Sequence, residues 1–220
     1  MTTHYEHDLE LIRRKIYRMA DLAMEDVTRA VESLKNGDTG AAEKIIEDDR
    51  ILDSLEVEID EDCIRFIVTR QPAAVDLRLV LAMLKITTDL ERIGDLSGNI
   101  AKETIRQDGA KPFKAFIDIP RMSGIATDMM RDTFAAMSEM DGKKARRVIE
   151  RDVEIDALNL QVYRELFSYM AEESRLISRA LGYIMVAKHL ERIGDHIANI
   201  AERAVYYIEG VDIRHLPVSV

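Results

Sequence analysis

The chain has 220 residues, of which 47% are hydrophobic and 33% are charged, and its formal net charge is −10. The apolar content is enough for a packed core, and the acidic surplus argues against nucleic acid and anionic lipid as partners, because both carry negative charge. The single cysteine, Cys63, excludes an internal disulfide framework. The sequence has no signal-peptide pattern and no run of about 18 apolar residues. We therefore expect a cytoplasmic protein with no direct membrane insertion.

The composition is typical of a helical protein. Ala, Leu, Ile, Met, Glu, Lys and Arg dominate, and four prolines and ten glycines leave few interruptions, so we predict an all-α fold with long helices. A first helix is expected over residues 5–35, where apolar side chains recur at helical spacing. Asn36-Gly37-Asp38 ends it and caps a second helix over residues 39–69, which Gln71-Pro72 closes. A third helix is expected over residues 76–107.

A linker and three further helices complete the predicted organisation. Asp108-Gly109 and a stretch that holds Pro112 and Pro120 are interpreted as the linker between two halves. Further helices are expected over residues 121–140, 142–171 and 174–208. The predicted architecture is two tandem three-helix bundles, one in residues 1–110 and one in residues 120–210, followed by a C-terminal tail over residues 211–220.

The two halves share an internal duplication. LERIGD at residues 90–95 recurs letter for letter at residues 190–195, and Asn-Ile-Ala at residues 99–101 recurs at residues 199–201. Nine identities in twelve positions, at the same place in each half, indicate duplication. Upstream the offset is 103 residues, which aligns Asp49 and Asp53 with Asp152 and Asp156. The three-residue difference predicts a shorter loop in the second half, which lacks the Gln71-Pro72 turn.

Oxygen-bearing side chains recur every four residues on four of the predicted helices. At 100° per residue such side chains share one face, and on the third and sixth helices this face lies opposite the main apolar stripe. Carboxylate and amide oxygens suit hard or borderline cations such as Mg²⁺, Mn²⁺ and iron. We therefore predict metal-binding ridges formed by Asp49, Asp53, Glu91, Asp95, Asn99, Asp152, Asp156, Glu191, Asp195 and Asn199.

A plainer interpretation is that these acids are only hydrated. Acidic residues on an outward helix face usually contact water, and nearby arginines could pair with them, namely Arg50, Arg92, Arg151 and Arg192. Against this, like charges four residues apart repel each other, and four such pairs occupy equivalent points of the duplication. Both interpretations stay open.

Several other residues receive a structural interpretation. Gly94 and Gly194 stand inside predicted helices, where glycine costs about 1 kcal/mol relative to alanine, so they indicate the close approach of another helix in preference to a ligand. Cys63 lies on an apolar stripe and is interpreted as a buried thiol. His189 and His196 have no histidine counterparts in the first half and are interpreted as surface polar residues.

The motifs resemble those of the PhoU family over essentially the whole chain. The resemblance rests on LERIGD-x-x-x-N-I-A in both halves, on Gln71-Pro72-x-x-x-Asp76-Leu77-Arg78, and on the closing segment from Asn199 to Gly210. It implies two three-helix bundles side by side. It also implies metal clusters held through E(D)-x-x-x-D motifs, which map onto Asp49/Asp53, Glu91/Asp95, Asp152/Asp156 and Glu191/Asp195. The metal could be iron, zinc, manganese or magnesium.

The resemblance also implies a function. Members are accessory proteins of the phosphate-specific transport system, and they restrain phosphate uptake and the phosphate-starvation response. The expected partners are the ATPase subunit of the phosphate ABC transporter and a sensor histidine kinase, and a homodimer is expected. One departure is that Asn159 stands where the first half has Glu56, so the two sites can differ in charge, affinity or metal number.

We expect a negative regulator that is not an enzyme, with no catalytic and no organic-cofactor residues, because the chain shows no P-loop and no nucleophile–base pattern. One alternative is a carboxylate-bridged metalloenzyme, but such sites normally use Glu-x-x-His, and none of the five histidines follows a glutamate by three residues. A second alternative is a purely structural helical oligomer whose acids only solubilise it.

Overall fold

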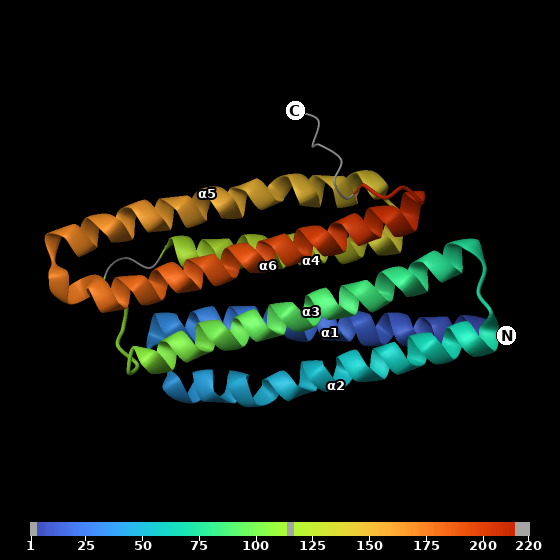
Figure 1. The fold of residues 1–220 in the computed structure, drawn as a ribbon, viewed down its shortest axis with the longest axis horizontal. Coiled ribbons are helices and arrows are strands. Elements are labelled where there is room, and N and C mark those ends of the chain that lie inside the picture. The colour runs from blue at the N-terminus through green and yellow to red at the C-terminus, as the bar shows by residue number, and fades with distance from the viewer. Residues whose placement is uncertain (1–3, 114–116, 214–220) are drawn as a thin grey trace.

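The computed structural model describes residues 4–113 and 117–213, and this part of the chain forms six α-helices without a β-strand (Figure 1). The all-α prediction is confirmed, and each helix begins and ends within three residues of its predicted bounds. The helices are α1 (His4–Asn36), α2 (Thr39–Arg70), α3 (Ala74–Arg106), α4 (Asp118–Glu139), α5 (Gly142–Glu172) and α6 (Ile177–Glu209).

Each repeat forms a three-helix bundle, and the two bundles lie side by side (Figure 1). Helices α3 and α6 pack against each other in the middle, α1 packs against α4, and α2 and α5 occupy the outer edges. The apolar stripes predicted on the third and sixth helices are fully buried in this core: Ile86, Leu90, Ile93 and Ile100 on α3, and Val186, Leu190, Ile193, Ile197 and Ile200 on α6. Their burial joins the two repeats into one core.

The first interhelical turn of each repeat is built in the same way. The Asp38 carboxylate accepts a hydrogen bond from the backbone N–H of Ala41 at 2.9 Å, and Asp141 accepts one from Lys144 at 3.0 Å. Such N-caps satisfy helix donors that have no partner within the helix. The residues just before these caps, Gly37 and Met140, both have a positive φ, +69° and +55°. The equivalence confirms the offset of 103 residues.

Two helix starts differ from the prediction by one turn. Pro120 was assigned to the linker, but it lies in the first turn of α4, where proline is tolerated because that turn has no intrahelical acceptor for its N–H. Residues Ser174–Leu176 were assigned to the sixth helix, but they form a 3₁₀ turn and α6 begins at Ile177. The prediction of a shorter loop in the second half is wrong: residues 173–176 connect α5 to α6, whereas residues 71–73 connect α2 to α3. The three-residue difference is taken up instead by the later start of α6.

Other predictions fall on core and terminal residues. Cys63 is fully buried, and burial together with Asp60 and Asp62 raises the pKa of its thiol to about 12, which confirms a structural thiol. Within the described residues, none of the helices has the length and apolar character needed to cross a membrane. The predicted tail over residues 211–220 falls outside the described residues from residue 214 onward.

Candidate functional site

The predicted acidic ridges of neighbouring helices meet within each repeat. Asp49 and Asp53 of α2 lie close enough to Glu91 and Asp95 of α3 for their charges to interact, and these four residues are called the first acidic cluster. In the second repeat the same holds for two residues of α5 and two of α6. The second acidic cluster consists of Asp152, Asp156, Glu191 and Asp195. The structure therefore brings eight of the ten predicted ligands into two groups.

The glycines inside α3 and α6 make these groups possible. A Cβ atom at Gly94 would lie 2.5 Å from Leu52 Cδ1 and 3.3 Å from Asp49 Oδ1 on α2. A Cβ atom at Gly194 would lie 2.6 Å from Asp152 Oδ1 and 3.0 Å from Ile155 Cδ1 on α5. Real Cβ atoms essentially never approach another atom within 3.0 Å, so a larger residue at either position would displace the Leu52 or Asp152 side chain of the neighbouring helix. The helix-packing interpretation of these glycines is confirmed, and the approach also presses the first acid of each cluster against the neighbouring helix.

Asp152 is the most perturbed acid of the second cluster. Burial, followed by the charges of Asp195, Asp156 and Glu191, raises its pKa to about 7. Its Oδ1 atom is buried and accepts no hydrogen bond. Burial and the charges of Glu191 and Asp156 also raise the pKa of Asp195. The cluster thus concentrates negative charge where water is partly excluded, which disfavours the ionised carboxylates and favours a bound cation or proton.

The first cluster carries a milder version of the same electrostatics. Burial and the charges of Asp53 and Asp95 raise the pKa of Asp49, while Lys102 lowers it. Burial and the charge of Asp95 also raise the pKa of Glu91, with smaller contributions from other neighbours. The presence of Lys102 explains part of the difference between the repeats, because it supplies positive charge beside the first cluster.

Basic residues of the chain hold some of the predicted ligands. Arg92 lies 3.4 Å from Glu91 and 3.2 Å from Asp95, and Lys188 donates to both carboxylate oxygens of Glu191 at 2.6 Å. Within residues 4–113 and 117–213, no three His, Cys, Asp or Glu side chains are arranged to hold a metal ion as they stand. Binding a cation would therefore require some of these side chains to leave their basic partners and rotate inward.

The oxygen atoms available at and near the clusters nevertheless suit a cation. Asp152 Oδ1 and Asn159 Oδ1 on α5, and Asp60 Oδ1 on α2, are buried oxygens without a hydrogen-bond donor. A buried acceptor without a partner is costly, and a hard cation would satisfy such oxygens. Asp60 and Asn159 lie outside the two clusters, seven residues after Asp53 on α2 and three residues after Asp156 on α5. Their spacing was visible in the sequence, but only their burial distinguishes them from hydrated neighbours.

The two predicted asparagine ligands lie at the margin of the clusters. Asn99 accepts a hydrogen bond from Lys102 at 3.1 Å, and the charge of Lys102 acts on Asp49 of the first cluster. In the described part of the chain, no hydrogen bond joins Asn199 to the second cluster. The asparagines therefore extend the two ridges without being held against the carboxylates.

The histidines differ from their surface interpretation. His196 Nδ1 lies 2.9 Å from Asp89 Oδ1 across the contact between α6 and α3, and both side chains are mostly buried. His189 Nδ1 is buried without a hydrogen-bond partner, and burial followed by the charge of Arg192 lowers the pKa of His189. Both residues lie between packed elements because helix α6 meets α3 on this side, which helical periodicity within one repeat does not reveal.

Comparison with known proteins agrees with this architecture. A family model described as the PhoU domain matches residues 16–104 and again residues 119–204. The chain is 36% identical over 218 residues to the phosphate-specific transport system accessory protein PhoU homolog of Pseudomonas putida, covering 98% of this chain and 85% of that one. It is 39% identical over 208 residues to the homolog of the same name from Aquifex aeolicus, covering 94% of each chain.

Solved structures give the same result. The crystal structure of PhoU from Pseudomonas aeruginosa superimposes with a TM-score of 0.87 at 35% identity, covering 94% of this chain and all of that one. The phosphate transport system regulatory protein PhoU from Streptococcus pneumoniae superimposes with a TM-score of 0.87 at 27% identity, covering 95% and 99%. Because the family model matches both repeats and the relatives match nearly end to end, the chain belongs to the PhoU family.

Proposed function

We propose that this chain regulates phosphate transport as a non-catalytic adaptor. The observation that carries the proposal is the match over nearly the whole length to relatives named phosphate-specific transport system accessory proteins. In this proposal the chain contacts the ATPase subunit of the phosphate ABC transporter and a sensor histidine kinase, and it restrains uptake when phosphate is plentiful. It acts in the cytoplasm, where both contacts would be accessible.

The acidic clusters give the adaptor a variable surface. A bound iron, zinc, manganese or magnesium ion would supply positive charge among the carboxylates. The residues that would hold it are Asp49, Asp53, Glu91 and Asp95 in the first repeat and Asp152, Asp156, Glu191 and Asp195 in the second, with Asn99 and Asn199 beside them. Lys188 and Arg92 neutralise part of each cluster at present. Cation occupancy would release these basic side chains of α3 and α6 and change the charge that each cluster presents to a partner.

A homodimer is part of the proposal. Helix α5 exposes Val153, Leu160 and Phe167 to water by 65%, 51% and 59%. These residues are spaced by seven, and apolar side chains at that interval lie along one stripe of a helix and support pairing with another helix. The stripe therefore supports a second copy at the outer edge of the molecule.

Deletion of the gene is expected to raise phosphate uptake and the expression of starvation reporters under phosphate-rich conditions. Wild-type protein should restore both to normal. The variant with alanine at Glu91, Asp95, Glu191 and Asp195 should fail to restore them, because it removes carboxylates from both clusters. A matched variant with alanine at Glu43, Glu47, Glu150 and Glu154 removes the same charge outside the clusters and should restore both. Unchanged uptake and reporters after deletion would exclude the proposed regulation.

The metal content is checked separately. Tag-free wild-type protein loaded with iron, zinc or manganese should retain metal in a fixed ratio to protein after dialysis, as measured by mass spectrometry. The Glu91/Asp95/Glu191/Asp195→Ala variant should retain none, because each cluster loses two carboxylates. If both proteins retain equal amounts, or neither retains any, the clusters are not the metal ligands and act instead as protein-contact surfaces.

A further inference from the structure

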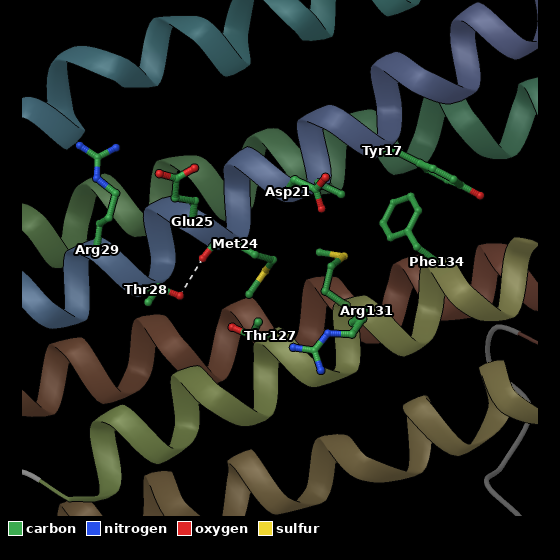
Figure 2. A pocket seen from close by; sticks show the side chains of 11 residues that line it. Tyr17, Asp21, Met24, Glu25, Thr28, Arg29, Thr127, Arg131 and Phe134 are labelled. Atoms are coloured by element: carbon green, nitrogen blue, oxygen red, sulfur yellow. Dashed lines mark hydrogen bonds between the residues drawn. The ribbon is translucent and has the colours of Figure 1, made fainter.

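A groove runs between α1 and α4, where the two repeats meet away from the acidic clusters. Its cavity of about 520 Å³ has an apolar floor that includes Ala20, Met24, Met130 and Phe134. Figure 2 shows the Met24 side chain directed into the space between the two helices, and Tyr17 and Phe134 facing each other at one end. Their rings meet edge to face with centroids 5.0 Å apart. The groove is therefore apolar at its base and bounded by an aromatic pair.

The groove continues beyond the aromatic pair. A second cavity of about 310 Å³ shares Tyr17 with the first, and its lining also includes residues of α3, α4 and α6. Its basic side chains have partners within the chain, since Arg14 lies 3.1 Å from Glu10 and Arg13 donates to the Tyr207 hydroxyl at 3.4 Å. Along α1 the two cavities together span residues 10–29. At 1.5 Å per residue this is a length of about 28 Å, or roughly five helical turns.

The charged residues of the first cavity are unequally paired. Arg29 lies 3.1 Å from Asp26 and 3.6 Å from Asp48, and Arg131 lies 2.9 Å from Asp128. Asp21 and Glu25 also line the cavity and are exposed. Among the described residues these two acids have no ion-pair or hydrogen-bond partner. The basic side chains of the lining are thus neutralised within the chain, and the α1 wall keeps two free negative charges one helical turn apart.

We propose that this groove docks a basic amphipathic helix of a partner protein. An apolar groove between two packed helices accepts a third helix, whose apolar stripe enters it at intervals of three and four residues. Methionine suits such a surface because its flexible, polarisable side chain adapts to different partners. Two Lys or Arg residues four positions apart on the docked helix would face Asp21 and Glu25. An acidic helix would be repelled by these residues and by the net charge of −10. The inference goes beyond phosphate regulation and does not depend on cation binding at the clusters.

A dye-labelled 16-residue peptide with leucine at positions i, i+3, i+4 and i+7 and lysine on the flanks is a suitable probe. Its fluorescence anisotropy should rise saturably with the wild-type protein. The Asp21→Lys/Glu25→Lys variant should weaken binding by roughly tenfold or more, because two ion pairs become two repulsions. The matched Glu43→Lys/Glu47→Lys variant makes the same charge change on α2, also four residues apart, and should change affinity by less than about twofold.

Tryptophan fluorescence can show whether the peptide binds within the groove, because the wild-type chain has no tryptophan. Thr28 is exposed and lines the groove, so the emission of a Thr28→Trp variant should shift to shorter wavelength when the peptide binds. The emission of a Glu43→Trp variant should not shift. Several results would overturn the proposal: no binding by the wild type, equal losses in the two charge-reversal variants, or equal binding of a peptide with the same composition and a scrambled apolar pattern.

Discussion

Alanine at position 37 is expected to destabilise the protein by roughly 3 kcal/mol, although it adds a single carbon atom. Gly37 has a φ of +69°, a conformation that costs other residues about 1 kcal/mol or more. A Cβ atom there would overlap the carbonyl oxygen of Gly109, which belongs to the turn after α3. Because the obstacle is backbone, it cannot rotate away. The turn between α1 and α2 would have to separate from the end of α3.

Chemical denaturation followed by circular dichroism measures this loss, and the chain offers two informative controls. Gly40 lies in the first turn of α2, and a Cβ atom there meets only Asp38 Oδ1, at 3.6 Å. Gly40→Ala should therefore stabilise the protein by about 0.5–1 kcal/mol, since it lowers the entropy of the unfolded chain. Met140 occupies the equivalent of position 37 in the second repeat with a side chain already present. A destabilisation of Gly37→Ala below about 0.5 kcal/mol would show that the two turns are not in contact.

The turn at Gly37 illustrates what the sequence reveals about the fold. Asn36-Gly37-Asp38 indicates the end of one helix and the start of the next, because glycine adopts a positive φ and aspartate caps. The contact with Gly109 depends on how three helices pack, so no local pattern contains it. Pro120 shows the converse: proline is compatible with both a linker and the first turn of a helix. Its sequence neighbourhood alone does not choose between them.

The acidic clusters were partly predictable for a similar reason. A spacing of four residues places Glu91 and Asp95 on one face of a helix, and the duplication shows which positions correspond. The Lys188–Glu191 ion pair follows from a spacing of three residues within α6, but the spacing does not reveal that the Oδ1 atom of Asp152 is buried, because that depends on the neighbouring helix. The contact between His196 and Asp89 crosses from one repeat to the other and lies beyond the periodicity of either.

The groove between α1 and α4 is the feature that the sequence predicts least well. Its two walls come from the first helix of each repeat, about 100 residues apart, and each wall alone looks like an ordinary amphipathic helix. In the sequence Arg18 stands three residues before Asp21 and Arg29 four residues after Glu25, so both acids have a possible basic partner within the helix. Only the structure shows that Arg29 pairs with Asp26 and Asp48 instead.

Asparagine at position 152 is expected to stabilise the metal-free protein by about 2 kcal/mol at pH 8. Folding raises the pKa of Asp152 from 3.8 to about 7, through burial and then the charges of Asp195, Asp156 and Glu191. Each pKa unit of this shift corresponds to about 1.4 kcal/mol of folding free energy. Because the Asp152 side chain is partly exposed to water, roughly half of the resulting free energy is expected to remain. The amide of asparagine keeps the shape of the carboxyl group without its charge. The folded state of the variant therefore avoids the free-energy cost of ionising a buried carboxyl group at pH 8.

The pH dependence follows from the same shift. Between pH 3.8 and 7 the folded protein holds the Asp152 proton more tightly than the unfolded chain does, so stability falls as the pH rises through this window. The metal-free wild type should therefore show a higher Tm at pH 6 than at pH 8, and Asp152→Asn should flatten this difference. Glu150→Gln removes an exposed charge from the same helix and should leave the pH dependence as it is. An unchanged slope in Asp152→Asn would mean that Asp152 is ionised at little cost.

A cation and a proton compete for the same oxygens, and this competition separates a metal ligand from a buried acid. At pH 8, excess Mn²⁺ should raise the Tm of the wild type, because an ion that binds only the folded state stabilises it by about 2.7 kcal/mol at a hundred times its Kd. The gain should shrink at pH 6, where more of the Asp152 carboxyl group is protonated. In Asp152→Asn the gain should be small at both pH values. If Mn²⁺ stabilises both proteins equally, the cation binds elsewhere, and Asp152 serves only to hold a proton in the contact between α5 and α6.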